Sequence, residues 1–136
     1  MINIRDVVKI KMPFPNISSA LACRAHMYIC CDNSDFDKVI KVQTFKPFLL
    51  TRIENYLDSD YYIGEHPFKD KSLIDLDKCF NIEKGKLTKK LKVANNNGQI
   101  SERFHSDIMS NTTNLFFCND IHINTEELVS VDDYIS

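Results

Sequence analysis

Two residues in the first fifth of the chain combine a fixed positive charge with a group that titrates near neutral pH. Arg24 and His26 are two positions apart in an expected strand, so we expect both side chains on one face. A guanidinium matches two oxygens of a phosphate, and an imidazole can accept a proton at neutral pH. The pair suits chemistry at a phosphate group, although an arginine paired with an acid and a hydrogen-bonded histidine are the simpler structural explanations.

Three expected strands with short connections position this pair. The first lies within residues 3–12 and ends before Pro13, because proline cannot donate a hydrogen bond to a strand ladder. The second runs from Arg24 to Cys31 and closes at a polar turn. The third, Val39 to Thr44, mixes β-branched and polar residues as half-buried strands do. We expect the hydroxyl of Thr44 to meet the guanidinium where these two strands adjoin.

Several blocks of the chain occur in an order and approximate spacing known from one protein family. They are Asp6-Val7-Val8, Met12-Pro13-Phe14-Pro15, Arg24 to Ile29, Val39 to Thr44, Ser72 to Ile82 and Lys86-Leu87. In turn they resemble the Gly-Asp-Val strand, the Pro-Phe-Pro-like loop, the Arg-Pro-x-Leu-Val strand and the later strands of the MazF/PemK ribonuclease toxins. The resemblance covers roughly residues 3 to 92.

This resemblance implies a mainly β domain with peripheral helices, an SH3-like small β-barrel, that forms a homodimer. It implies metal-independent cleavage of single-stranded RNA, with a 2′,3′-cyclic phosphate and a 5′-hydroxyl as products. Arg24 and Thr44 take the positions of the family's catalytic pair, and His26 is our own suggestion for a general base. No metal or cofactor is expected, and the expected partners are RNA, a cognate antitoxin protein and a second copy of the chain.

The chain departs from the family pattern at three places. Arg5 replaces a glycine, so the tight turn that glycine would permit is not expected there. Ala25 replaces a proline, and Phe45-Lys46 replaces a Ser-Gln pair. These differences bear on the RNA sequence that the chain would select.

Further residues are predicted to contact RNA: Asn16, Ser18, Ser19, Lys46, Lys86 and Lys89. The loop with the first three directly precedes Arg24, and the lysines could hold phosphates. A run of lysines is more often a solvated helix face. The net charge of −2 means that any RNA contact must be local, and three scattered glycines exclude a phosphate-binding glycine loop.

Length and composition indicate one globular domain. The chain has 136 residues, with 43% hydrophobic and 26% charged residues, which is enough for a single core. It shows no signal-peptide pattern and no apolar run of membrane-spanning length, so a cytoplasmic protein is expected. The five cysteines lack metal-binding spacing, and we expect them to be reduced and mostly buried.

The remaining elements are predicted from hydrophobic spacing and from capping residues. We expect a helix at 47–57, strands at 61–63 and 72–82, a helical turn at 86–92, a helix capped by Ser101, a short strand or helix end at 115–118, and a helix at 126–135. Residues 95–136 form a helical extension of the domain in this scheme. Two other functions fit the same pattern: a CcdB-like gyrase poison, and a non-catalytic regulator whose extension covers the groove.

Overall fold

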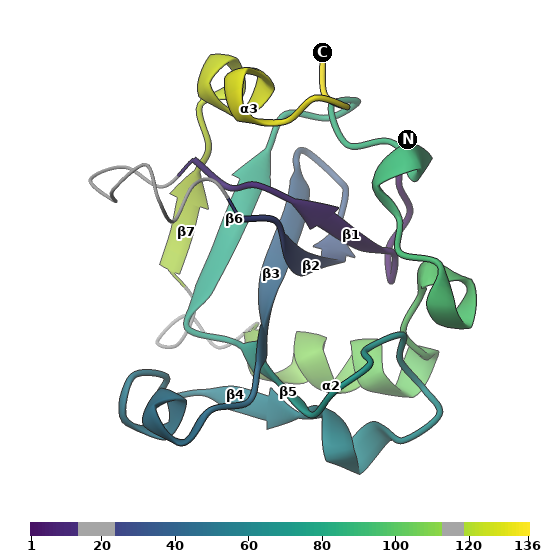
Figure 1. Cartoon of the computed structure of the whole chain (residues 1–136), viewed down its shortest axis with the longest axis vertical. Coiled ribbons are helices and arrows are strands. Elements are labelled where there is room, and N and C mark those ends of the chain that lie inside the picture. The colour runs from purple at the N-terminus through teal and green to yellow at the C-terminus, as the bar shows by residue number, and fades with distance from the viewer. Residues whose placement is uncertain (14–23, 113–118) are drawn as a thin grey trace.

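Seven strands form one sheet in the computed structural model, which describes residues 1–13, 24–112 and 119–136 (Figure 1). The strands in these ranges are β1 (Val7–Ile10), β2 (His26–Asp32), β3 (Asp37–Thr44), β4 (Tyr56–Asp58), β5 (Ser72–Asp75), β6 (Lys78–Ile82) and β7 (Asn119–His122). The same ranges contain two α-helices, α2 (Glu102–Thr112) and α3 (Thr125–Val131). The expected β-rich fold with peripheral helices is therefore confirmed, while closure into an SH3-like barrel stays a prediction.

Strand β3 lies at the centre of the sheet. One edge pairs with β2, and the other edge is shared between β5 and β6. Thr44 at the end of β3 is opposite Ser72 of β5, whereas Asp37 at its beginning is opposite Ile82 of β6. All three pairings are antiparallel, so β5 and β6 continue one another along the same edge of β3.

The single strand predicted over 72–82 is thus two strands. The chain leaves the ladder at Leu76 and Asp77. The carboxylate of Asp77 accepts hydrogen bonds from the backbone N–H groups of Glu54 (2.9 Å) and Asn55 (3.0 Å). These bonds fix the segment before β4 beside the break, which is a tertiary arrangement that alternation of residue types does not reveal.

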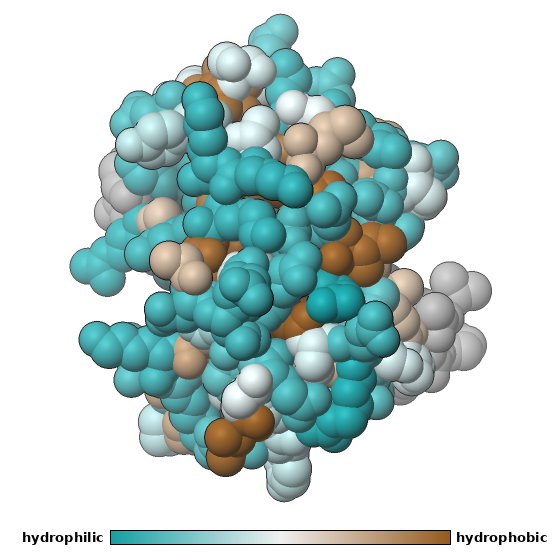
Figure 2. All heavy atoms as spheres, turned by 90° about the vertical axis from the view of Figure 1, so that its right-hand side faces the viewer, coloured by the Kyte–Doolittle hydropathy of each residue, from teal (hydrophilic) through white to brown (hydrophobic). Residues whose placement is uncertain are grey.

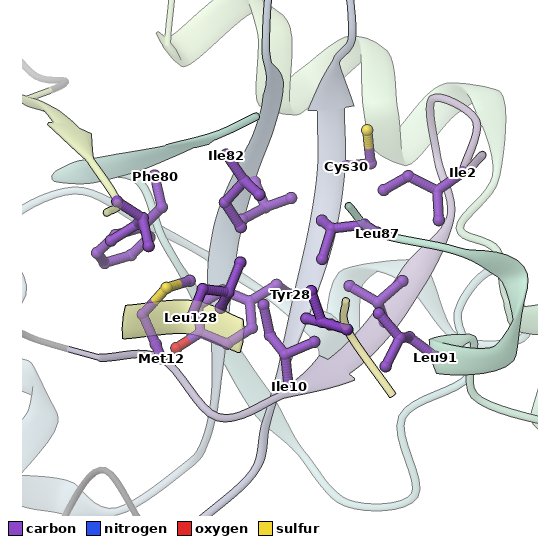
Figure 3. Close-up of a cluster of buried hydrophobic side chains, with 14 residues drawn as sticks. Ile2, Ile10, Met12, Tyr28, Cys30, Phe80, Ile82, Leu87, Leu91 and Leu128 are labelled. Carbon is purple, nitrogen blue, oxygen red and sulfur yellow. The ribbon is translucent and has the colours of Figure 1, made fainter. Parts of the chain in front are cut away.

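Both faces of the sheet are buried. On one face, Ile29, Ile40 and Ile74 pack with Phe104 and Ile108 of α2. The opposite face is packed by the other alternating residues together with α3 and the segment after β6: Val8, Ile10, Tyr28, Cys30, Val39, Phe80, Ile82, Leu87, Leu91 and Leu128 (Figure 3). Because both faces are covered, β2 is apolar over most of its length and does not alternate between apolar and polar residues.

Helix α2 begins where the sequence predicts. The Oγ atom of Ser101 accepts a hydrogen bond from the N–H of Phe104 (3.1 Å), which satisfies one free donor of the first turn. The ring of Phe104 stacks on Tyr62 at a centroid distance of 3.9 Å, and the Tyr62 hydroxyl donates to Asp107 (2.6 Å). These contacts attach the helix to the segment between β4 and β5.

Two short elements before β5 differ from the prediction. The helix expected over 47–57 is a 3₁₀ helix, Pro47–Thr51, and the chain then enters β4. The strand expected at 61–63 is replaced by a second 3₁₀ helix, Ser59–Tyr62. The carboxylate of Asp58 caps this helix by accepting a hydrogen bond from the N–H of Asp60 (2.9 Å).

The extension from residue 95 is not purely helical, which corrects the prediction. Strand β7 pairs in parallel with β6, with Phe80 opposite Ile121. Helix α3 is confirmed but ends at Val131, earlier than the predicted residue 135. The strand or helix end predicted for 115–118 lies outside the described residues.

The tight turn near the start of the chain is present even though glycine is absent. Arg5 has φ of 80°, in the left-handed region that favours glycine, so the expected loss of the turn is wrong. The arginine side chain compensates for the backbone cost, since its Nε donates to the carbonyl oxygen of Ile100 (3.0 Å). The turn places Asp6, which is fully buried, beside the sheet.

Thiol chemistry is not prominent in the described part of the chain. Cys30 and Cys31 are free and buried, and burial raises the pKa of the Cys31 thiol to about 12. Such a thiol is not a nucleophile at neutral pH. Cys79 is disulfide-bonded, so the prediction that all five cysteines are reduced is wrong.

The surface in view in Figure 2 is largely hydrophilic, with apolar residues in small separate patches. Within the described ranges, no helix combines the length and the apolar composition that crossing a bilayer demands.

Candidate functional site

A hollow of about 210 Å³ opens where β2 begins and β3 ends. It is lined by His26, Gln43, Thr44, Lys46, Phe48 and Leu49. The strand register explains this grouping. Met27 of β2 is opposite Val42 of β3, so the next step outward places His26 opposite Gln43, and opposed residues project to the same side of a sheet.

Thr44 joins this group because it is the last residue of β3. Successive strand residues face opposite sides, so a hollow that contacts both Gln43 and Thr44 lies at the end of the strand and not on one face. The side chain of Thr44 is exposed there, and the chain then turns through Lys46 into the 3₁₀ helix that starts at Pro47. That turn brings Phe48 and Leu49 to the same hollow.

The environment of His26 favours its neutral form. Partial burial is the largest cause that holds the pKa of this imidazole below its ordinary value of 6.5. The positive charges of Lys41, Arg24 and Lys9 lower the pKa further, because each opposes a second positive charge nearby. At neutral pH the ring is therefore uncharged and able to accept a proton, as the sequence analysis requires of a general base.

Arg24 lies beside the hollow but does not line it. It is exposed and precedes β2, which begins at His26, so the expectation that Arg24 starts the strand is wrong. Strand alternation therefore does not place the Arg24 side chain on one face with His26. Its charge still acts on His26, although no hydrogen bond within the described residues joins Arg24 to Thr44.

The other residues predicted to bind RNA are placed unequally. Lys46 lines the hollow. The structure does not bring Lys86 or Lys89 there: the Lys86 Nζ donates to the carbonyl oxygen of Ser136 (3.0 Å), and Lys89 is exposed in the 3₁₀ helix Lys89–Leu91. The three loop residues Asn16, Ser18 and Ser19 lie outside the described residues.

Two residues of the hollow, Gln43 and Phe48, are not predicted from the sequence. Gln43 directly precedes Thr44, and within the described segments its amide makes no hydrogen bond. Phe48 is 49% exposed, and the guanidinium of Arg52 lies 5.1 Å from its ring centre. An aromatic residue just after an X-Pro turn was the one available signal for this position.

A second cavity, of about 390 Å³, adjoins the start of β2 through Ala25. It is lined by lysines from β1, from the residue just after β1 and from the segment after β6, together with acidic and aromatic residues near the C-terminal end: Lys9, Lys11, Lys90, Lys92, Asp132, Asp133 and Tyr134. The lysines and the two aspartates make this cavity a mixed-charge surface, in which the Lys92 ammonium is paired with the carboxylate of Asp6.

In the ranges that the structure describes, no three histidine, cysteine, aspartate or glutamate side chains are grouped so that they could hold a metal ion. No protein-family model, no curated protein and no solved structure matches the chain.

Proposed function

We propose that this chain is an endoribonuclease of the MazF/PemK type, the toxin of a toxin–antitoxin pair, which cleaves single-stranded RNA without a metal ion. The observation that carries the proposal is the convergence of His26 and Thr44, from two paired strands, on one hollow. Arg24 next to the hollow supplies the fixed positive charge. The order of the sequence blocks that resemble this family gives independent support.

The reaction uses the nucleophile that RNA itself contains. Neutral His26 takes the proton of the 2′-hydroxyl, and the 2′-oxygen forms a bond to the adjacent phosphorus. The bond from phosphorus to the 5′-oxygen breaks, that oxygen takes a proton from water to give a 5′-hydroxyl, and protonated His26 returns its proton to the solvent. The five-coordinate phosphorus species carries extra negative charge on its oxygens. Arg24 and Thr44 donate hydrogen bonds to these oxygens and stabilise that charge.

The exposed position of Arg24 fits this role if the substrate brings the guanidinium over the hollow. A long side chain outside the strand can turn toward a phosphate bound between Thr44 and Lys46, and the phosphate charge favours that rotamer. A homodimer would extend the groove with residues of a second copy. A flexible antitoxin segment that becomes ordered on binding would fill the groove and block RNA.

Purified protein is expected to cut a long single-stranded RNA in the presence of EDTA and to leave 2′,3′-cyclic phosphate and 5′-hydroxyl ends. End-group analysis by mass spectrometry reads out both termini. RNA that stays intact, together with inhibition of DNA gyrase, would support the CcdB-like alternative. Cleavage that requires a divalent metal would contradict the proposed mechanism.

The pH dependence of cleavage tests His26. Because its pKa lies below 6.5 and the neutral ring is the base, we expect the rate to fall only as the pH drops below 6.5. Lys9→Gln removes one positive charge and raises the pKa of His26, so the acidic limb moves toward higher pH. His26→Ala is expected to lower the rate by about 10²- to 10⁴-fold and to remove the limb. An unchanged profile in His26→Ala would exclude this histidine from the mechanism.

The same shift affects folding. In the unfolded chain His26 titrates at its ordinary pKa, so the unfolded state binds the proton more readily. The free energy of unfolding therefore decreases as the pH falls through 6.5, and the His26→Ala variant loses this dependence.

A further inference from the structure

We infer that the hollow at the end of β3 binds one nucleobase beside the cleaved phosphate, and that Gln43 and Phe48 select adenine there. This inference rests on the proposed function, because it assigns the base next to the phosphate that Arg24, His26 and Thr44 act on. Neither Gln43 nor Phe48 takes part in the chemistry described above. Their side chains share the hollow with His26 and Thr44, and the arrangement offers both a stacking surface and a hydrogen-bonding edge.

Phe48 supplies the stacking surface. Its side chain is about half exposed, and the Arg52 guanidinium lies over the ring, 5.1 Å from its centre. The backbone is held by the 3₁₀ helix Pro47–Thr51, in which the Thr51 hydroxyl donates to the carbonyl oxygen of Phe48 (2.6 Å). An exposed ring fixed in this way suits an unstacked RNA base, since stacking on aromatic side chains is the usual means by which proteins hold single-stranded bases.

Gln43 supplies the hydrogen-bonding edge. It is half-buried, it follows Val42 on β3, and it lies directly before Thr44, so a base held here is adjacent to the reacting phosphate. The Gln43 amide makes no hydrogen bond within the described residues, so one donor and one acceptor remain available in the hollow. Adenine presents a donor beside an acceptor, as cytosine also does, but the two-ring purine offers Phe48 the larger stacking surface, and glutamine is the usual side-chain partner of adenine.

The neighbouring groups agree with a base and not with a second phosphate at this position. Leu49 is buried at the hollow and, with Phe48, gives it an apolar part, whereas Lys46 and Thr44 contribute an ammonium and a hydroxyl group that suit the backbone phosphate. An apolar part with one amide is typical of a site for a flat heterocycle.

Cleavage mapping on an RNA pool that contains all sixteen dinucleotide junctions tests the assignment. We expect the parent protein to cut next to adenine at least about tenfold more often than next to guanine. Gln43→Glu replaces donor and acceptor by two acceptors, which match the adjacent N–H donors of guanine, so the preference should reverse. Gln43→Met, of similar shape and without the amide, should still cut and should lose the preference. Cleavage with an unchanged preference in both variants would overturn the inference.

Separate measurement of KM and kcat tests whether Phe48 stacks on a base. Phe48→Leu keeps an apolar side chain but loses the stacking surface, so we expect KM for RNA to rise about tenfold with kcat nearly unchanged. Phe48→Tyr is the matched control and should behave as the parent. Thermal unfolding of each variant establishes that the fold is retained. Equal KM values for all three proteins would contradict base stacking at this residue.

A binding experiment separates failure of this inference from failure of the nuclease proposal. If the parent protein cuts no RNA, adenosine 3′-monophosphate and guanosine 3′-monophosphate are titrated into ¹⁵N-labelled protein. A saturable shift of the Gln43 side-chain amide resonances with the adenosine compound, weaker with the guanosine compound, supports base recognition without cleavage. In Gln43→Met the backbone amide of Thr44 is followed instead, and its shifts with the two nucleotides should become equal. In the parent protein, no shift, or equal shifts with both nucleotides, overturns the inference.

Discussion

Arg24→Ala is expected to lower the rate of RNA cleavage by about 10²- to 10³-fold, the loss that follows removal of one charge-stabilising donor from an active site. Arg24 is exposed and lies outside β2, so the substitution leaves the two hydrophobic clusters untouched. The effect should appear in kcat more than in KM, because the added negative charge develops only in the transition state. Single-turnover cleavage of a labelled RNA measures it.

Two further variants show whether the loss comes from the guanidinium of Arg24 or from any lost positive charge. Arg24→Lys keeps the charge but loses the planar pair of donors, and we expect intermediate activity. Lys38→Ala removes a positive charge about 20 Å away along β3, six residues before Thr44, and should cut normally. Full activity of Arg24→Ala would remove the guanidinium from the mechanism and leave His26 and Thr44 as the catalytic residues.

Asp6→Ala is expected to lower the free energy of unfolding by about 3 kcal/mol, near the lower end of the range for breaking a buried ion pair. Its carboxylate is fully buried and accepts from the N–H of Asn3 (2.7 Å) and the side-chain amide of Gln99 (2.9 Å). The ammonium of Lys92 lies 3.1 Å from it. The substitution leaves these three donors without their acceptor. Because the Lys92 side chain is 19% exposed it can still reach water, which keeps the loss at the lower end.

Denaturant unfolding at several pH values checks the same site. Hydrogen bonds and the Lys92 ammonium hold the pKa of Asp6 below its ordinary value of 3.8, against the opposing effect of burial. Its contribution to stability is therefore complete above that value and disappears as the pH falls through the lower, folded-state pKa. Glu102→Ala is the matched control. Glu102 forms an ion pair with Arg5 at 3.4 Å, yet the Glu102 side chain is 90% exposed. We therefore expect Glu102→Ala to lower the free energy of unfolding by at most about 0.5 kcal/mol.

The sequence predicts the beginning of the fold better than its middle. Strands β1, β2 and β3 are read correctly in order because prolines and a polar turn separate continuous apolar runs. The break between β5 and β6 is missed because it depends on Asp77 binding the backbone of residues 54 and 55, which is a tertiary contact. Strand β7 is missed because parallel pairing with β6 joins segments about forty residues apart, and no local pattern encodes it.

In the candidate site too, some residues are predictable from local sequence and others depend on tertiary contacts. Thr44 and Lys46 could be named from the sequence because Pro47 marks the end of β3. His26 could be named for its titrating ring near Arg24, although β2 begins two residues later than predicted. Gln43 and Phe48 could not, since their joining the hollow depends on the β2–β3 register and on the turn at Pro47. The position of Arg24 outside the strand was likewise not predictable, because the chain leaves the ladder only one pair beyond Met27.

The division of one edge of β3 between two strands has a consequence for how this molecule can change over evolutionary time. The half of β3 that ends in Thr44 is hydrogen-bonded to β5, whereas the half that begins at Asp37 is bonded to β6. Among the described strands, β7 pairs with β6. Insertions or replacements in residues 119–122 therefore act on the ladder far from the hydroxyl. Related sequences could therefore gain or lose segments beside β7 while Thr44 and the hollow at the end of β3 stay unchanged.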